Sequence, residues 1–395
     1  MVNSIIICKF VTIIPNSYTI MVLRDLQKRI EANLFKRKVI ILMGARQVGK
    51  TTLIHQIAED QGVTTLFLNC DEPEPRNLLT DTNVLKLKQL IGQAKLVLID
   101  EAQRVRNIGL TLKLIVDNIP EVQVIVTGSS SLEIANEMNE PLTGRKYEYT
   151  LYPFSTNELV GNTNYLNEKQ LLEQRLIYGC YPDVVNYPAE AKETLLNLTN
   201  SYLYKDLLAY NDVRKSSQLE KLVEALALQI GSEVSYSELG QLIQSNNHTV
   251  ERYIDLLEQS FVIFRLRAFS GNVRNEIKKS RKIYFYDNGI RNAIIQNFNP
   301  LNLRQDLGAL WENFFVSERI KHNHYQQNYA KSYFWRSFQQ QEIDLIEVQD
   351  GDITAFEMKW NKNKKSKIPI TFSNAYPIKN SYTVNPDNYI DFLLS

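Results

Sequence analysis

The sequence predicts an α/β fold with a parallel sheet, and three apolar runs in its N-terminal half carry this prediction. The runs 38–43, 96–99 and 122–127 show no alternation of polar and apolar residues, which is typical of strands buried on both faces. After the first run comes a glycine-containing turn, and then Leu53 and Ile57 recur at helical spacing. Strand, turn and helix in this order indicate a βα unit.

Composition sets bounds on the domains and on the class of protein. The chain has 395 residues, 45 Lys plus Arg against 44 Asp plus Glu, and 44% apolar residues. This length predicts two or three domains, and no apolar stretch approaches the roughly 20 residues of a membrane span, so no membrane partner is expected. Cys8, Cys70 and Cys180 form no C-x-x-C pair. They therefore favour a reducing, cytoplasmic location over a disulfide framework or a zinc site.

The net charge of +1 conceals an uneven distribution along the chain. Residues 151–270 hold 10 basic and 15 acidic side chains, a balance of −5, whereas residues 271–395 hold 17 and 13, a balance of +4. Phosphate neutralisation supplies much of the affinity for nucleic acid. The C-terminal segment is thus the one suited to approach DNA, unless the opposite charges hold the two segments together.

Residues 1–20 are predicted to be an upstream extension. Lys9 interrupts their apolar run, and neither a basic cluster nor an A-x-A-like site marks a signal peptide. Helical periodicity begins just after Met21, with Leu23 and Leu26. The alternative is a genuine N-terminal strand.

The turn after the first apolar run is a complete G-x4-G-K-T loop. Its glycines let backbone N–H groups close around phosphate oxygens, Lys50 reaches the β and γ phosphates, and Thr51 offers its hydroxyl to Mg²⁺. Between a strand and a helix this motif is specific, so ATP and Mg²⁺ are the expected ligands. The residues expected to bind the nucleotide are Gly44, Ala45, Arg46, Gln47, Val48, Gly49, Lys50, Thr51 and Thr52.

The second apolar run ends in two acids. Asp100 is placed to hold Mg²⁺ through water, together with Thr51, and Glu101 is placed to orient and deprotonate the attacking water. The alternative is a pair of solvated acids at the end of a strand. The presence of Glu101 favours hydrolysis over nucleotide binding alone.

Two further residues are candidates for the same reaction. Ser129 follows the third apolar run, where a small polar side chain can contact the γ phosphate or the attacking water, although it can equally cap the next helix. Arg145 can stabilise transition-state charge on the γ phosphate of a neighbouring protomer, or it can be an exposed structural arginine. The first reading of Arg145 favours a homo-oligomer.

Together these motifs resemble the AAA-type ATPases of the AAA-14 group that precede a DUF4143 domain. The resemblance rests on G-A-R-Q-V-G-K-T, L-I-D-E-A-Q, T-G-S-S-S, L-T-G-R and L-Y-P-F-S, which occur in that group's order. It covers the chain from Met21 onward. It implies a P-loop ATPase core over residues 21–160, in which helices sandwich five parallel strands. One departure is Cys180, where the group's G-G-Y-P turn usually has its second glycine.

Residues 161–270 are predicted to be a helical and winged helix-turn-helix segment. Ser235 and Glu238 spell a capping box for a short helix, a second helix follows, and 261–269 is strand-like. The apolar positions of the second helix are Val250, Tyr253, Ile254 and Leu257. Its polar face holds Glu251, Arg252, Asp255 and Glu258, a formal charge of −2. Because this charge opposes phosphates, packing between the two flanking domains is favoured over reading DNA.

Residues 271–395 are predicted to form a separate α/β domain, with a helix over 306–320 before three strand-like runs. Glu357 and Lys359 are two apart in the last run, so they share one face of a strand. If the last two runs form a hairpin, Asp344 lies beside Glu357. Two carboxylates and a lysine on one face can coordinate Mg²⁺ and position a water for attack on a phosphodiester.

The pattern D-x12-E-x-K, with an acid on the preceding helix, resembles the PD-(D/E)XK nuclease core. By this resemblance Glu312, Asp344, Glu357 and Lys359 take the active positions of a nuclease-like domain. An ion-paired core is the alternative. His322 and His324 are expected to be surface residues that take no part in the chemistry.

Two functions follow from these expectations. In the first, ATP hydrolysis is coupled to a C-terminal nuclease-like effector acting on DNA. In the second, the protein is an ATP-dependent switch or scaffold that acts through a protein partner, with an inactive nuclease-like domain.

Overall fold

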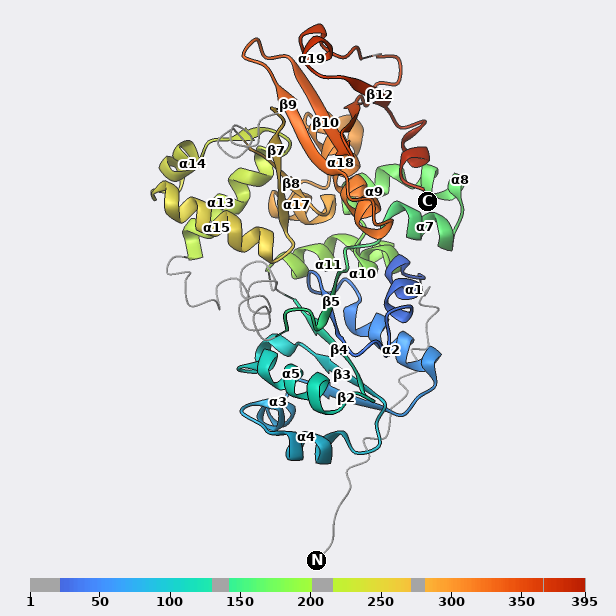
Figure 1. Cartoon of the computed structure of the whole chain (residues 1–395). Coiled ribbons are helices and arrows are strands. Elements are labelled where there is room, and N and C mark those ends of the chain that lie inside the picture. Colours follow the sequence, from blue (N-terminus) through green and yellow to red (C-terminus); the bar gives the residue numbers. More distant parts are fainter. Residues whose placement is uncertain (1–21, 130–141, 201–215, 271–280, 365, 395) are drawn as a thin grey trace, which may run out of the picture.

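Two β-sheets organise the chain, and they lie towards opposite ends of the molecule (Figure 1). The computed structural model describes residues 22–129, 142–200, 216–270, 281–364 and 366–394. The expected extension, residues 1–20, lies outside the described part of the chain. One sheet has five strands and the other has seven.

The five-stranded sheet is parallel throughout, in the order β2-β3-β4-β1-β5. Its strands are β1 (Val39–Met43), β2 (Thr65–Asn69), β3 (Leu96–Asp100), β4 (Gln123–Gly128) and β5 (Lys146–Thr150). The prediction of an ATPase-type core with five parallel strands is confirmed. Because parallel neighbours end at the same edge, the turns after β1, β3 and β4 lie side by side.

Helices cover both faces of this sheet, which explains why its strands show no alternation in the sequence. Ile40 and Leu42 of β1 join one buried cluster with Ile54, whereas Val39 and Ile41 join the cluster on the opposite face. The helices of this part are α1 (Asp25–Glu31), α2 (Lys50–Gln61), α3 (Pro73–Leu79), α4 (Val84–Ile91) and α5 (Ile108–Asn118). A strand between two helical layers needs apolar side chains in both directions.

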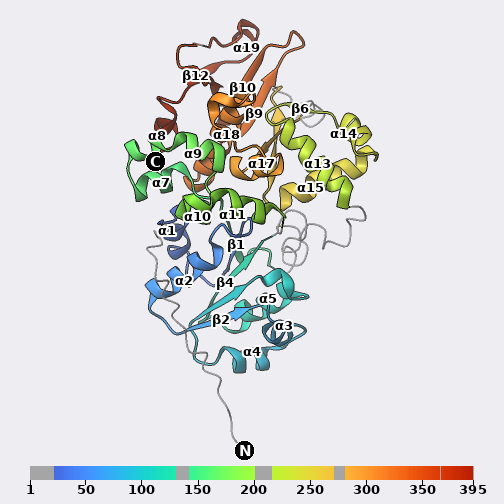
Figure 2. The same cartoon turned by 180° about the vertical axis from the view of Figure 1, so that it is seen from behind.

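A layer of short helices lies between the two sheets. Figures 1 and 2 show α10 and α11 between the parallel sheet and the C-terminal part from both sides. The helices of this segment are α7 (Thr156–Asn162), α8 (Tyr165–Gln170), α9 (Leu172–Tyr178), α10 (Pro182–Asn186) and α11 (Ala191–Leu198). The two ends of the molecule are therefore joined through a helical layer.

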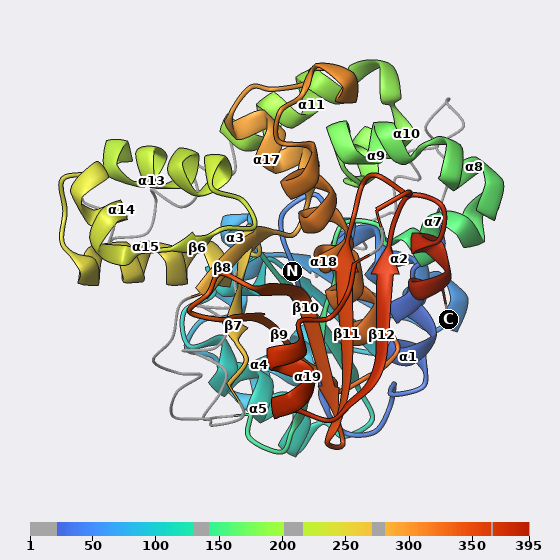
Figure 3. The same ribbon diagram turned by 90° about the horizontal axis from the view of Figure 1, so that it is seen from above.

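The seven-stranded sheet joins β6, β7 and β8 to the C-terminal strands, in the order β12-β11-β10-β9-β7-β8-β6. Strand β7 pairs antiparallel with β8 and parallel with β9, so one sheet runs across residue 270, where we expected a domain boundary. The described elements between residues 216 and 285 are α13 (Ser216–Leu228), β6 (Glu233–Val234), α14 (Tyr236–Leu242), α15 (Asn247–Gln259), β7 (Ile263–Ala268) and β8 (Arg281–Phe285). Seen from above, α13, α14 and α15 stand to one side (Figure 3).

The C-terminal part is built around one long helix, α18, which packs on β8 and β11. Strands β9, β10 and β11 form an antiparallel meander, and β12 adds to β11 in parallel. The elements are α17 (Asn288–Ile294), α18 (Leu307–Tyr325), β9 (Lys331–Arg336), β10 (Glu342–Gln349), β11 (Asp352–Met358), α19 (Ile370–Ala375) and β12 (Ile378–Val384). Aromatic side chains such as Trp311 and Phe315 of α18 fill the core against this sheet.

Candidate functional site

The G-x4-G-K-T loop connects β1 to α2, as its sequence context predicted. The backbone takes positive φ angles at Gly44 (150°), Gln47 (57°) and Gly49 (92°). At Gly44 there is also no room for a side chain, because a Cβ atom would lie 2.1 Å from the carbonyl oxygen of Leu151. The first glycine is thus required both by its φ angle and by the segment after β5, which presses on the loop.

Lys50 is buried at the start of α2, with 5% of its surface exposed. Its Nζ donates to the carbonyl oxygens of Gly44 and Ala45, each at 2.8 Å. Burial lowers the pKa of Lys50 to about 8, although Glu101 and Asp100 favour the charged form. Among the described residues the Lys50 ammonium donates to carbonyl oxygens alone, and a buried ammonium of this kind fits the phosphates that such loops bind.

Asp100 lies at the end of β3 between two threonine hydroxyls. Thr51 Oγ1 donates to one carboxylate oxygen at 2.9 Å, and Thr127 Oγ1 of β4 donates to the other. Thr51 and Asp100 are thereby brought together, as the magnesium prediction requires. A hydroxyl and a carboxylate at this edge of the sheet fit a Mg²⁺ ion that keeps several waters.

Glu101, Gln103 and Ser129 form a hydrogen-bonded cluster beside Asp100. Gln103 Nε2 donates to the Glu101 carboxylate and, at 3.0 Å, to Ser129 Oγ; Ser129 Oγ in turn lies 3.3 Å from Glu101 Oε2. Glu101 itself takes a left-handed conformation, with φ 52°, and its N–H donates to Thr127 Oγ1. The candidate base is therefore held in one orientation by its neighbours.

Thr127 and Gln103 are the residues of this site that sequence reasoning missed. Both stand inside motifs that were recognised, T-G-S-S-S and L-I-D-E-A-Q, but no role was given to either. Gln103 lies two residues after Glu101, and Thr127 lies at the end of an apolar run like the one that ends in Asp100. These positions could have identified both residues.

Arg145 lies away from this site. It precedes β5 at the amino end of the sheet, and its carbonyl oxygen accepts from the N–H of Val39, whereas the P-loop follows the carboxyl end of β1. Its Nε donates to Asp117 of α5 at 2.7 Å, an exposed ion pair. Arg145 could therefore contact only a nucleotide that is bound to another protomer.

The C-terminal candidates are brought together by neighbouring strands: Asp344 lies on β10, Glu357 lies on β11, and Lys359 follows the end of β11. Lys359 Nζ lies 2.9 Å from Glu357 Oε2 and 3.6 Å from Asp344 Oδ2. Asp344 also accepts from the N–H of Met358 at 2.8 Å, and Ser366 donates to Glu357. The other carboxylate oxygen of Glu357 is buried and has no hydrogen-bond partner among the residues that the structure describes.

Glu312 approaches the same cluster from α18, held by two residues of β8 that sequence reasoning missed. Lys282 Nζ and the Tyr284 hydroxyl donate to the same oxygen of Glu312, at 2.9 and 2.6 Å. Lys282 is only 2% exposed and also pairs with Glu342. Nothing in the sequence near Glu312 points to these partners, because residues 281–285, which form β8, were not predicted to be a strand.

Burial is the main cause of raised pKa values in this cluster. It raises the pKa of Glu312 to about 7 and that of Glu357 to about 7, and the nearby Asp344 carboxylate adds to both shifts. Lys282 and Lys359 act in the opposite direction. Within the described residues no group of three or more His, Cys, Asp or Glu side chains is close enough to hold a metal ion.

The acidic face of α15 is neutralised by arginines of the adjoining strands. Arg265 of β7 pairs with Asp255 at 2.7 Å and with Glu258, and Arg281 of β8 lies 3.8 Å from Glu251. These acids therefore hold the helix on its own sheet.

The two histidines differ from expectation, since His322 and His324 are half-buried, and burial lowers the pKa of His324 to about 4.

The turn with the unusual Cys180 keeps its backbone role without the second glycine. Gly179 has φ 73°, and a Cβ atom there would overlap the Asp287 carboxylate, so the first glycine is the required one. The N–H of Cys180 donates to Asp287 at 2.7 Å, and its carbonyl oxygen accepts from Phe154. Its side chain is buried, and burial raises the pKa of the thiol.

Comparison with family models assigns the two ends of the chain. Residues 36–160 match an AAA domain, and residues 307–392 match a domain of unknown function, DUF4143. The chain therefore combines an AAA domain with a DUF4143 domain. Residues 169–301 match a further domain of unknown function, DUF8612. The last match contains β7 and β8 and so also crosses residue 270.

Curated proteins from three organisms are similar to this chain, and each bears the name "Uncharacterized protein". One from Mycobacterium tuberculosis is 26% identical over 346 residues, covering 85% of this chain and 73% of the relative. One from Haemophilus influenzae is 26% identical over 275 residues, with 65% and 68% covered. One from Methanocaldococcus jannaschii is 22% identical over 314 residues, with 74% and 69% covered.

Solved structures resemble the chain at low overall similarity. The Holliday junction branch migration motor RuvB of Thermotoga maritima is 14% identical, with a TM-score of 0.34 over 62% of this chain and 90% of that chain. DnaA of Aquifex aeolicus is 16% identical, with a TM-score of 0.25 over 59% and 86%. Likeness at this level carries no argument about substrates.

Within the described residues no helix is long and apolar enough to cross a membrane.

Proposed function

We propose that the protein is a Mg²⁺-dependent ATPase in which Lys50 and the P-loop bind the phosphates and Glu101 activates the attacking water. The observation that carries the proposal is the convergence of three strand ends, which brings Lys50, the Thr51–Asp100 pair and the Glu101–Gln103–Ser129 cluster together. The bound Mg²⁺ ion would supply charge neutralisation of the β and γ phosphates.

Each residue of this site has a separate role. Lys50 exchanges its two carbonyl acceptors for phosphate oxygens, and Thr51 with Asp100 orients the metal's oxygen ligands. Glu101 accepts the proton of a water, while Gln103 and Ser129 keep its carboxylate in position. The assignments of Ser129 as a sensor and of Arg145 as a group offered to a second protomer belong to this proposal.

Glu101→Gln tests the ATPase directly. The variant should bind Mg²⁺–ATP with wild-type affinity and lose turnover by about a hundredfold or more, since it keeps the shape of the side chain but not its basicity. Turnover is measured by phosphate release and affinity by calorimetry. Glu59→Gln, an exposed acid on α2, is the matched control. Unchanged hydrolysis in Glu101→Gln would remove Glu101 from its role.

A second proposal concerns the C-terminal cluster, which we infer to be a phosphodiester-cleaving site that uses a divalent cation. It is favoured by the buried, unpartnered oxygen of Glu357 beside Asp344, because such an oxygen is what a bound cation would satisfy. Lys359 pairs with both of these carboxylates, and Lys282 pairs with Glu312, which favours the alternative, an ATP-dependent switch acting through a protein partner.

Cleavage and metal binding separate these two functions. If the site is active, the wild-type protein should degrade DNA or RNA with Mg²⁺ or Mn²⁺. The Asp344→Ala variant should lose this cleavage, and the Lys50→Ala variant should cleave at an altered rate. Mn²⁺ affinity in Lys50→Ala should rise between pH 6 and pH 8, since Glu357, with a pKa of about 7, must lose its proton to bind the ion. Absence of both cleavage and binding at pH 8 would support the scaffold.

A further inference from the structure

Arg24 is a buried guanidinium that contacts the P-loop from outside the recognised motif. It lies just before α1 with 8% of its surface exposed. Its Nη1 donates to the Val48 carbonyl oxygen at 2.7 Å, its Nη2 to the Tyr152 carbonyl oxygen at 2.6 Å, and its Nε to Glu158 at 2.9 Å. A rigid planar fork with several donors suits three acceptors from separate segments.

The contact with Val48 fixes a peptide group of the nucleotide site. The Val48 carbonyl and the Gly49 N–H belong to one peptide unit, and in a trans peptide they point in opposite directions. With the carbonyl held by Arg24, the Gly49 N–H is directed away from Arg24, and a Cβ atom on Gly49 would lie 3.6 Å from Arg24 Nη1. Gly49 precedes Lys50, so this peptide lies at the N-terminus of α2 where the loop binds phosphate.

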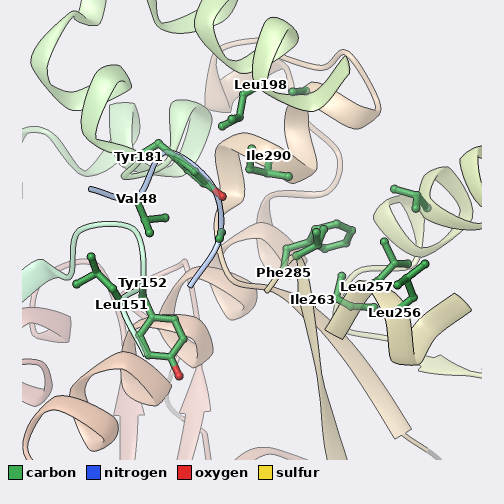
Figure 4. Close-up of a cluster of buried hydrophobic side chains, with 14 of the residues drawn as sticks. Val48, Leu151, Tyr152, Tyr181, Leu198, Leu256, Leu257, Ile263, Phe285 and Ile290 are labelled. Atoms are coloured by element: carbon green, nitrogen blue, oxygen red, sulfur yellow. The ribbon is translucent and has the colours of Figure 1, made fainter. Parts of the chain in front are cut away.

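The contact with Tyr152 connects the same guanidinium to the C-terminal part. The N–H of Tyr152 donates to the Tyr325 hydroxyl at 3.0 Å, and Tyr325 is the last residue of α18. Figure 4 shows Val48, Leu151 and Tyr152 in one buried cluster. The two residues after β5 therefore contact both neighbours: Leu151 lies against the P-loop, and Tyr152 is hydrogen-bonded to α18.

Two further residues of α18 hold the segment that follows. Glu318 accepts from the N–H of Thr156 at 2.6 Å, and Lys321 donates to the Phe154 carbonyl oxygen at 3.2 Å. Glu318, Lys321 and Tyr325 are spaced i, i+3 and i+7, so they lie on one face of the helix. The segment 152–156 is thus fastened to α18 at three points.

We propose that Arg24 is a positioning residue of the nucleotide site, which sets the Val48–Gly49 peptide for phosphate binding and transmits nucleotide occupancy through Tyr152 to α18. The inference rests on the proposed ATPase. A bound phosphate shifts the Val48–Gly49 peptide. The Arg24 guanidinium moves with the Val48 carbonyl to which it donates, and the Tyr152 carbonyl moves with the guanidinium. The helix that receives this change also carries Glu312 of the C-terminal cluster.

The test compares Arg24→Lys with the exposed Arg37→Lys in the full chain. Lysine keeps a cation beside Glu158 but cannot reach three acceptors, so affinity for Mg²⁺ with a non-hydrolysable ATP analogue should fall about ten- to hundredfold. In turnover, KM for ATP should rise by more than kcat falls. Wild-type affinity in Arg24→Lys would overturn the inference while leaving the ATPase intact. No analogue binding by the wild-type protein would overturn both.

Tyr325→Phe tests the connection to α18: it removes the hydroxyl, which also interacts with Arg24, but leaves the contacts of Arg24 with Val48, Tyr152 and Glu158 in place. Adding the analogue to the wild-type protein, or to the control Tyr329→Phe, should slow amide hydrogen exchange in residues 307–325. In Tyr325→Phe this response should be lost, although the analogue still binds. An equal response in Tyr325→Phe, or none in the wild-type protein with analogue bound, would overturn the transmission. This arm decides the inference if Arg24→Lys does not fold.

Discussion

Buried charged side chains, more than the motif letters themselves, define the chemistry of this protein at the scale of single residues. Burial lowers the pKa of Lys50 to about 8 and raises that of Glu357 to about 7. In both cases a ligand of opposite charge would restore the charged form. The protonation of each group is therefore linked to binding.

Nucleotide affinity should depend on pH through Lys50. Below about pH 8 the free protein already carries the ammonium, whereas above it a proton must be taken up on binding. The affinity for Mg²⁺–ATP should thus weaken between pH 7 and pH 9, by up to about tenfold per pH unit at the upper end. Calorimetry in buffers of different ionisation enthalpy measures the proton uptake. Lys50→Arg, which stays charged, should flatten the dependence, and equal slopes would contradict the assignment.

Gln103 should matter for turnover rather than for binding. Gln103→Ala frees the Glu101 carboxylate and Ser129 from their shared donor, so kcat should fall about tenfold while KM changes little. Steady-state kinetics measures both. The exposed Gln93→Ala is the control. A rise in KM with kcat unchanged would show that Gln103 helps to bind ATP instead.

At the scale of elements, close approach of backbones decides which glycines are required. The segment after β5 lies so close to the P-loop that Leu151 leaves no room for a Cβ atom at Gly44. The same reason makes Gly179 necessary beside Asp287, although Cys180 replaces the next glycine. Each of these contacts joins the parallel sheet or the helical layer to a neighbouring element.

Gly44→Ala should therefore be costly in a way that other glycine substitutions are not. The added methyl group must push Leu151 away or move the loop, so the free energy of unfolding should fall by about 2–4 kcal/mol and nucleotide binding should be lost. Gly161→Ala, in α7 with nothing within 4 Å, should instead raise stability by about 0.5–1 kcal/mol. Thermal or urea unfolding compares the two, and equal effects would contradict the argument.

For the whole molecule, the decisive feature is that the middle segment and the C-terminal part share one sheet. Strand β7 contributes the edge to which β9 adds, and β8 supplies Lys282 and Tyr284 to Glu312. The opposite charges of the two segments meet in pairs such as Arg336–Glu233 and Arg281–Glu251. Part of the C-terminal positive charge is thus neutralised within the molecule, which leaves less of it for nucleic acid.

A fragment that begins at residue 301 should not fold on its own. It keeps the DUF4143 match but loses β7 and β8, which exposes the edge of β9 and leaves buried Glu312 without its two donors. Circular dichroism and gel filtration should show an unfolded or aggregated chain. A fragment that begins at residue 216 keeps the whole seven-stranded sheet and should be folded. A stable, monomeric 301–395 fragment would contradict this view.

Local sequence was sufficient for three strands of the parallel sheet, the P-loop and the candidate magnesium and base residues, whereas the count of five strands followed from the family resemblance. A phosphate-binding loop needs consecutive backbone N–H groups, and the strand, loop and helix that provide them are neighbours in the chain. The acids after β3 follow in the same way, because parallel strands end at one edge. Gln103 and Thr127 were within reach of the same reasoning.

Only the tertiary structure decided what lies beside these motifs. Arg24 reaches Val48 and Glu158 across separations of 24 and 134 residues, and Lys282 reaches Glu312 from β8 of the seven-stranded sheet. Such contacts leave no local period or spacing in the sequence, because they depend on how sheets and helices pack. The sequence by itself determined the chemistry at each strand end, and packing determined which distant side chains hold it in place.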